Sequence, residues 1–226
     1  MVILQDRLQW ASQFFTWTAD EWSNVIWTDE CAFNVGGSPG RVYVTHRADE
    51  EYVDSCLLLR FKKLETIHIW GCFMGKQKGP LIIWDKAMMG KTIKSAAYCT
   101  HIVPHLEQFW YERSRQVNDY LYIQQDGTLA HRSKYTKDYY QQRGLLGYLL
   151  PWIACSPDLN LIEGVWRLMK GRINRRIPHP QTNEAMKAAI LEEWNAVDED
   201  DLNYLVLGIA DRVSAVRNSN GRHTKY

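Results

Sequence analysis

Three acidic side chains stand at positions that suit phosphodiester chemistry. Asp29 comes at the end of the apolar run VIWTDE, Asp126 ends the run LYIQQD, and Glu163 lies in an amphipathic segment that follows a turn-rich stretch. A site that holds two divalent cations needs anionic oxygen ligands fixed from several directions. Carboxylates at two strand ends and on one helix supply such ligands, so we hypothesise a two-metal phosphodiester site.

Each of these acids also has a simpler explanation. Glu163 comes three residues after Asn160, the pattern of a capping box, and four residues before Arg167, the spacing of a helical ion pair. Asp126 begins an Asp-Gly turn, and Asp29 is consistent with a solvated strand end. Taken one at a time, the acids leave these alternatives open.

The helix expected over residues 161–175 also carries a basic run. At about 100° per residue, Glu163 lies off the apolar stripe of this helix and on the same face as Arg167 and Lys170. An acid beside two bases could bind a metal ion while the bases bind phosphate. The simpler alternative is that these side chains form an ordinary solvated helix face. The run considered as a track for DNA phosphates comprises Arg167, Lys170, Arg172, Arg175 and Arg176.

Composition bounds the class of protein without identifying it. A chain of 226 residues with 46% hydrophobic residues can build a full core, and its 27 basic and 26 acidic residues nearly cancel, so any basic surface must be local. Five scattered cysteines without a C-x-x-C pair argue against a disulfide framework and indicate a reducing, intracellular setting. No apolar stretch has the length of a membrane span, so we expect a soluble protein without a membrane partner.

Hydrophobic periodicity predicts a mixed α/β domain in the order β-β-β-α-β-α-β-α with flanking helices. Alternating or apolar runs predict strands, and apolar residues spaced by three and four predict helices, one of which Pro104 should kink or split. Thr18 and Glu21 form a possible capping box in the helical lead-in over residues 1–24. The expected strands cover 25–28, 41–46, 66–74, 79–85, 121–125 and 147–152, and the expected helices 92–115, 133–142, 161–175 and 182–216.

Several sequence blocks resemble, in order, those of Tc1/mariner-type transposases. These blocks are WTDE at 27–30, GRVYVTHRADEEY at 40–52, WGCFMGKQKGPL at 70–81, QQDGTLAH at 124–131 and LPWIACSPDLNLIEGVWRLMK at 150–170. The resemblance runs from about residue 5 to the closing GRHTKY, and the signature SPDLN-x-IE-x-x-W is highly specific. Because the third acid is Glu and the spacing from Asp126 is that of Tc1-like members, the Tc1 branch fits better than the mariner branch.

The resemblance implies an RNase H-like fold with a DDE triad at Asp29, Asp126 and Glu163. These residues would hold two Mg²⁺ ions, for which Mn²⁺ could substitute, and would cleave DNA and transfer the cut strand to target DNA. His131 matches a histidine of the family's D-x-x-x-x-H pattern, and we expect it to support the ligands or a phosphate rather than bind metal directly.

The resemblance also implies partners and a domain plan. Transposon ends and target DNA would be the substrates, a homodimer the working form in the transposition complex, and the nucleus the location. Family members carry helix-turn-helix domains ahead of the catalytic domain. We expect residues 1–24 to form lead-in helices or a linker and residues 25–226 to form the catalytic domain, with the helix-turn-helix domains absent from this chain.

Four departures from the family pattern leave a second interpretation open. Gly127 and Leu129 replace the usual Asn and Pro after the second acid, Leu161 replaces the usual Pro before the third, and Gly164 loosens the helix after Glu163. None removes a carboxylate. The alternative to an active catalytic domain is therefore a decayed or host-recruited relic that binds DNA or protein.

Overall fold

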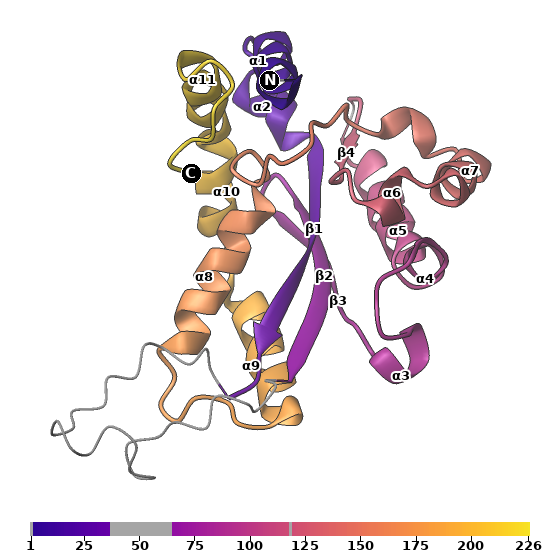
Figure 1. Cartoon of the computed structure of the whole chain (residues 1–226), viewed down its shortest axis with the longest axis vertical. Helices are drawn as coiled ribbons and strands as arrows, with labels where there is room; N and C mark the ends of the chain where they lie inside the picture. The colour runs from indigo at the N-terminus through magenta and orange to yellow at the C-terminus, as the bar shows by residue number, and fades with distance from the viewer. Residues whose placement is uncertain (1, 37–64, 118) are drawn as a thin grey trace, which may run out of the picture.

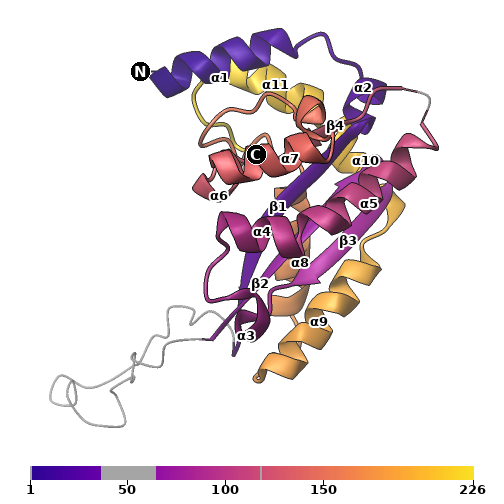
Figure 2. The same ribbon diagram turned by 90° about the vertical axis from the view of Figure 1, so that its right-hand side faces the viewer.

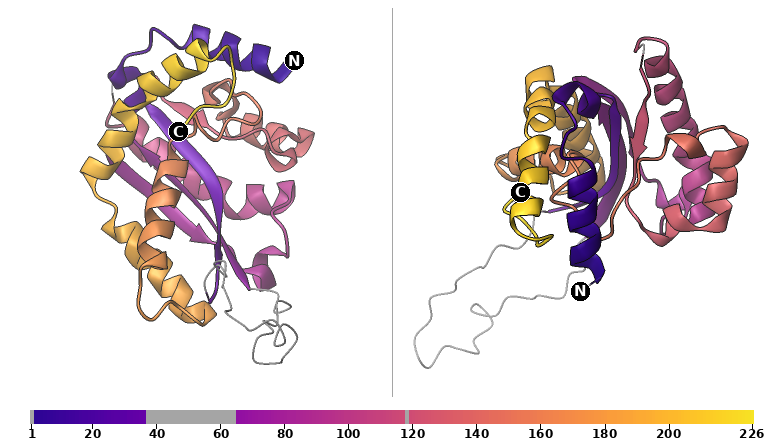
Figure 3. Two further views of the ribbon diagram at one scale, coloured as in Figure 1. Left: turned by 60° about the vertical axis from the view of Figure 1, so that its left-hand side comes forward. Right: turned by 90° about the horizontal axis from the view of Figure 1, so that it is seen from above.

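A four-stranded sheet lies between two layers of helices (Figures 1 and 3). The computed structural model describes residues 2–36, 65–117 and 119–226. The strand order is β3-β2-β1-β4, with β1 antiparallel to β2, β2 antiparallel to β3, and β1 parallel to β4. The strands are β1 (Val25–Asn34), β2 (Thr66–Met74), β3 (Gln77–Ile83) and β4 (Tyr122–Gln124). This mixed α/β arrangement confirms the predicted fold class, while the strand expected over 41–46 lies outside the described residues.

The first strand is longer than predicted, and Asp29 lies in its middle and not at its end. β1 continues to Asn34 because its pairing with β2 extends to the Asn34–Thr66 pair and because Cys31 and Phe33 continue the inward alternation that Trp27 begins. In the sequence, the charged pair Asp29–Glu30 suggests that the strand ends here. Asp29 therefore lies inside the sheet, where the neighbouring strands can hold it in position.

The strand expected over 147–152 is also wrong. Residues Leu146–Tyr148 form a single 3₁₀ turn, and only one bridge, between Ile123 and Leu149, joins this segment to β4. The Leu150 N–H still donates to the Ile123 carbonyl at 2.9 Å. Pro151 then lacks an N–H for a ladder, so the segment leaves the sheet after this contact.

One face of the sheet is covered by the helices that follow β3 and β4 (Figure 2). The predicted helix over 92–115 is split at Ile102, and Pro104 occupies the first turn of its second half, as expected. Ser133 caps α7 by accepting from the Thr136 N–H at 3.1 Å. These helices are α3 (Lys86–Met89), α4 (Ser95–His101), α5 (Val103–Ser114), α6 (Leu129–Arg132) and α7 (Lys134–Gln142).

The C-terminal helices cover the other face, and the N-terminal helices pack at one end of this layer (Figure 1). Thr18 and Glu21 form the predicted capping box. None of the helices in the described ranges is long and apolar enough to cross a membrane. These helices are α1 (Val2–Gln13), α2 (Ala19–Ser23), α8 (Ile162–Asn174), α9 (Asn183–Ala196), α10 (Glu199–Leu207) and α11 (Ile209–Asn218).

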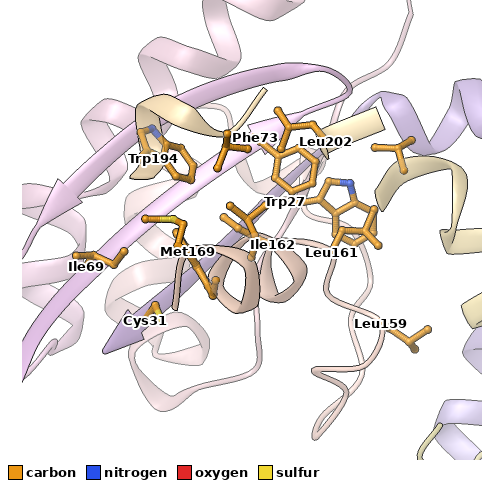
Figure 4. Close-up of a cluster of buried hydrophobic side chains, with 14 of the residues drawn as sticks. Trp27, Cys31, Ile69, Phe73, Leu159, Leu161, Ile162, Met169, Trp194 and Leu202 are labelled. Carbon is orange, nitrogen blue, oxygen red and sulfur yellow. The ribbon is translucent and has the colours of Figure 1, made fainter. Parts of the chain in front are cut away.

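The larger hydrophobic core lies between the sheet and α8 (Figure 4). Trp27 and Phe73 project from the strands toward Ile162 and Met169 of α8, and all four side chains have 0% exposure. Burying each such side chain contributes roughly 1.5–3 kcal/mol, so the position of α8 on the sheet is strongly determined.

A buried arginine joins the N-terminal helix to the loop that precedes α8. Arg7 of α1 has 0% exposure and forms a two-pronged ion pair with Asp158, at 2.9 and 2.6 Å. Its guanidinium also donates to the Ser156 hydroxyl at 2.6 Å and to the Gly221 carbonyl at 2.9 Å. Three distant parts of the chain therefore meet at one guanidinium.

We expect Arg7→Met to lower the free energy of unfolding by about 3–5 kcal/mol, because it leaves the Asp158 carboxylate buried without its cation. Urea unfolding measures this change. Asp6→Asn, at an exposed neighbouring position of α1, is the control and should change stability by less than about 0.5 kcal/mol. Equal stability of the two variants would contradict a structural role for the ion pair.

Candidate active site

The pairing of β1 with β4 brings Asp29 and Asp126 to adjacent positions. Trp27 pairs with Gln124 in the parallel ladder, and each acid lies two residues farther along its own chain. Thr28 extends the connection beyond the ladder, since its hydroxyl donates to the Gln124 carbonyl at 2.8 Å and its N–H to the Gln124 side chain at 3.2 Å. The two carboxylates are therefore carried by a doubly fixed pair of strands.

Alternation along β1 separates the two neighbouring acids onto opposite faces of the sheet. Trp27 and Cys31 pack in the core beneath α8, whereas Ile26 packs in the core beneath α4 and α5. Asp29 therefore faces α8, and Glu30 faces the other layer. The two acids can thus serve different partners although they are consecutive in the sequence.

Two glycines allow α8 to pack closely on its neighbours, Gly71 against the sheet and Gly164 against α10. Gly71 is the partner of Asp29 on β2, and a Cβ at this position would lie 2.8 Å from the Trp166 ring of α8. A Cβ at Gly164 would collide with the Leu205 side chain of α10. Gly164 thus permits close helix packing next to Glu163, and this gain offsets the loosening predicted from its low helix propensity.

All three predicted acids line one cavity of about 460 Å³. Asp29 comes from β1, Asp126 from the second residue after β4 and Glu163 from the first turn of α8. The remaining wall comes largely from Gly127–Thr128 and from the loop of residues 152–157. The structure therefore brings together the three carboxylates that lie far apart in the sequence.

Asp29 has the most perturbed carboxyl group of the three. Asn160 donates its amide to Asp29 Oδ2 at 3.0 Å, and the Glu30 N–H donates to Oδ1 at 2.8 Å. Burial, followed by repulsion from Glu30 and Glu163, raises the pKa of Asp29 to about 8. At neutral pH this carboxyl group therefore keeps its proton, and a cation placed beside it would favour the ionised form.

His131 connects Asp126 to Glu30. Its Nδ1 lies 2.7 Å from Asp126 Oδ1, and its Nε2 lies 3.4 Å from Glu30 Oε1. Burial opposes the charged form of His131, but its hydrogen bond with Asp126 and the nearby Glu30 carboxylate prevail and raise its pKa to about 10. Burial would likewise raise the pKa of Asp126, but hydrogen bonds from His131 and Thr128 outweigh it and lower that pKa. Asp126 is thus an anion held by a cationic histidine.

The donor set of the cavity fits a hard divalent cation. Its carboxylates supply oxygen ligands, and the buried Asn160 Oδ1 has no hydrogen-bond partner in the described part of the chain. Across the described ranges, however, no group of three or more His, Cys, Asp or Glu side chains forms a ready metal cluster. The Asp126 carboxylate is engaged by His131 and Thr128 instead of converging with Asp29 on one point.

The simpler explanations of Glu163 find no support. The Asn160 side chain donates to Asp29 and to the Thr28 carbonyl, so it does not cap α8. Among the described residues, the Glu163 carboxylate forms no ion pair with Arg167 within 4.0 Å. Asp126 does form the predicted turn, because its Oδ1 accepts from the Thr128 N–H at 3.0 Å.

The basic run on α8 divides between two faces. Arg167, Lys170 and Arg175 are exposed. Arg172 pairs with Asp201 at 3.2 Å, and Arg176 pairs with Glu192 and Glu193 at 2.8 and 2.5 Å. Helical geometry explains the division, because Arg172 lies about 180° around the helix from Glu163.

Sequence reasoning missed the groups that hold the acids in place. The sequence presents Glu30 only as a neighbour of Asp29, and Asn160 only as a possible helix cap. The period-2 pattern of β1 could have placed Glu30 on the face of His131. No sequence signal indicated that Arg7 would reach Asp158.

The raised pKa of Asp29 predicts a pH-dependent stability without divalent cations. The folded protein keeps this proton up to about pH 8, whereas an unfolded chain releases it near pH 4, so stability falls as pH rises between these values. We expect Asp29→Asn to remove this fall and to exceed the wild type in Tm at pH 8 in EDTA. Asp138→Asn, at an exposed position of α7, is the control. The same pH dependence in wild type and Asp29→Asn would contradict the electrostatic assignment.

Known proteins with similar sequences are transposases. The Tc1 transposase of Caenorhabditis elegans is 29% identical over 222 residues, which cover 97% of this chain and 77% of that protein. The Tc3 transposase of the same organism is 29% identical over 206 residues, which cover 91% of this chain and 59% of that protein. No family model matches the chain.

Solved structures give the same fold. The crystal structure of the catalytic domain of Mos1 mariner transposase covers 99% of this chain and 96% of its own, with a TM-score of 0.74 and 13% identity. A second Mos1 catalytic-domain structure, with Raltegravir and Mn, has a TM-score of 0.75 at 12% identity and covers 99% of this chain and 97% of its own. The chain is a homologue of the Tc1 transposases and has the fold of the Mos1 mariner transposase catalytic domain.

Proposed function

We propose that this chain is a transposase catalytic domain that cleaves DNA strands and joins them to target DNA with divalent cations. Asp29, Asp126 and Glu163 around one cavity are the observation that carries the proposal. Their positions match the acids of the DDE pattern, and the similarity to Tc1 transposases supports a transposase function. Structures of Mos1 with Mn and with Mg support the choice of cation.

The residues of the site have separate roles in this proposal. Asp29, Asp126 and Glu163 hold Mg²⁺ or Mn²⁺, and Asn160 orients the Asp29 carboxylate. Bound cations would activate the attacking water or 3′-hydroxyl and stabilise the departing oxygen. His131 orients Asp126 through Nδ1 and is itself positioned by Glu30, so it supports a ligand without binding metal.

DNA contacts are proposed for the exposed bases of α8. Arg167, Lys170 and Arg175 are exposed and form no ion pair with the described residues, whereas Arg172 and Arg176 are held by carboxylates of α9 and α10. The Mos1 structures include paired-end complexes. By analogy, we propose that this chain acts on transposon ends as a homodimer and works in the nucleus.

Two of the four departures from the family pattern are accommodated by packing, and the other two lie in open surroundings. Leu161 has 0% exposure and fills the main core at the start of α8, and Gly164 accommodates Leu205. A Cβ at Gly127 would meet nothing closer than 3.7 Å, and Leu129 is 81% exposed. None of these residues blocks the acid cavity, which favours a catalytic domain over a decayed or host-recruited relic.

The test is nicking of supercoiled plasmid DNA in Mg²⁺ or Mn²⁺. We expect Asp29→Asn, Asp126→Asn and Glu163→Gln each to reduce the rate by more than about 100-fold, since loss of a ligand should exceed the about 10–100-fold effect typical of groups that support ligands. His131→Asn should fall within that smaller range. Asp138→Asn should retain the wild-type rate. Undiminished nicking by any of the three triad variants would remove that residue from the site.

A further inference from the structure

A second large cavity lies on the other side of α8. It has a volume of about 900 Å³ and is formed by α8, α10, α11 and the C-terminal residues, which lie close together in Figure 1. Glu163 lines the acid cavity, and the next residue, Gly164, already lines this one. The two cavities therefore flank the same first turn of α8.

The second cavity contains a buried guanidinium without a carboxylate partner. Arg212 of α11 is only 6% exposed, and among the described residues it forms no ion pair. Its Nη1 donates to the Asp158 carbonyl at 3.0 Å, and its Cζ lies 5.3 Å from the centre of the Tyr226 ring. Arg212 therefore meets only the backbone carbonyl of Asp158, while the carboxylate of that residue is occupied by Arg7.

Other bases surround this uncompensated charge. Arg167, Arg175 and Lys225 also line the cavity. Of its two acids, Asp201 is paired with Arg172, and Asp211 lies in the first turn of α11. Burial, followed by the nearby Arg167, lowers the pKa of Arg212, while Tyr226 and Asp158 act in the opposite direction. A buried charge without a counter-ion is costly, so an external anion would be strongly favoured here.

We propose that this cavity is a phosphate-binding site, formed by Arg212 with Arg167 and Arg175, that holds the DNA backbone beyond the cleaved bond. Guanidinium groups suit phosphate because their planar N–H groups donate in pairs to its oxygens. The source of the phosphate rests on the proposed function. On α8, Arg167 and Arg175 lie about 6 and 18 Å along the axis from Glu163. At about 3.4 Å per phosphate of one strand, this corresponds to about two to five nucleotides from the acids.

The first experiment uses pyrophosphate as probe, in EDTA and at constant ionic strength adjusted with chloride. We expect pyrophosphate to raise the Tm of the wild type and of Glu163→Gln. Arg212→Met and the double variant Arg167→Gln/Arg175→Gln should lose at least half of this shift. The double variant alters exposed residues, so the test holds even if Arg212→Met does not fold. Lys187→Gln, an exposed base on α9, is the matched control.

The second experiment separates DNA from free phosphate. Fluorescence polarisation of a short duplex over a range of KCl concentrations, again in EDTA, gives the salt dependence of binding. Loss of Arg167 or Arg212 should lower the slope of log K against log salt by about 1 for each lost phosphate contact. Pyrophosphate should compete with the duplex.

Two results would overturn the proposal. An equal pyrophosphate shift in the wild type and in Arg167→Gln/Arg175→Gln would remove the site altogether. Loss of the pyrophosphate shift with an unchanged DNA salt slope would overturn the assignment to DNA in favour of a free phosphate ligand. Because both experiments exclude metal, a failure of the nicking proposal remains distinguishable from either result.

Discussion

The burial of Asp29 among other carboxylates is the constraint on which the rest of the site depends. Burial and the neighbouring Glu30 and Glu163 carboxylates raise its pKa to about 8, so the protein holds this group in an unfavourable environment. Such an arrangement persists only where surrounding structure fixes it. Asn160, the Glu30 N–H and the Thr28–Gln124 bonds provide that support.

The support extends outward to the ends of the described chain. Asn160 follows Asp158 in the loop before α8, and Arg7 ties Asp158 to α1 and to the Gly221 carbonyl. Core packing of Ile162 and Met169 against the sheet fixes the other end of that loop. The position of Glu163 therefore depends on contacts from α1, the sheet and the residues after α11. The buried Arg7–Asp158 ion pair thus helps to hold the loop that lines the acid cavity.

The meeting of the three acids at one cavity could be predicted from the sequence because the family motifs are specific, and the mixed α/β order followed from periodicity. The predictions that failed concerned individual segments and contacts. Asp29 and Glu30 resembled a strand end because charged residues rarely continue a strand that is buried on both faces. Residues 147–152 resembled a strand until Pro151, which cannot extend a ladder. Which bases of α8 are paired and which are exposed depends on where α9 and α10 pack, and helix propensities do not reveal that packing. Long-range contacts such as Arg7–Asp158 join residues with no shared pattern.

The central claim is that Asp29, Asp126 and Glu163 bind the same divalent cations. Fe²⁺ can be exchanged into such an oxygen-ligand site, and hydroxyl radicals generated there cut the nearby polypeptide. Mapping these cuts by mass spectrometry is the most direct test. We predict cuts close to residues 29, 126 and 163 that disappear when Mg²⁺ is in excess. Cuts that cluster elsewhere, or that persist unchanged in Mg²⁺, would contradict a shared cation site.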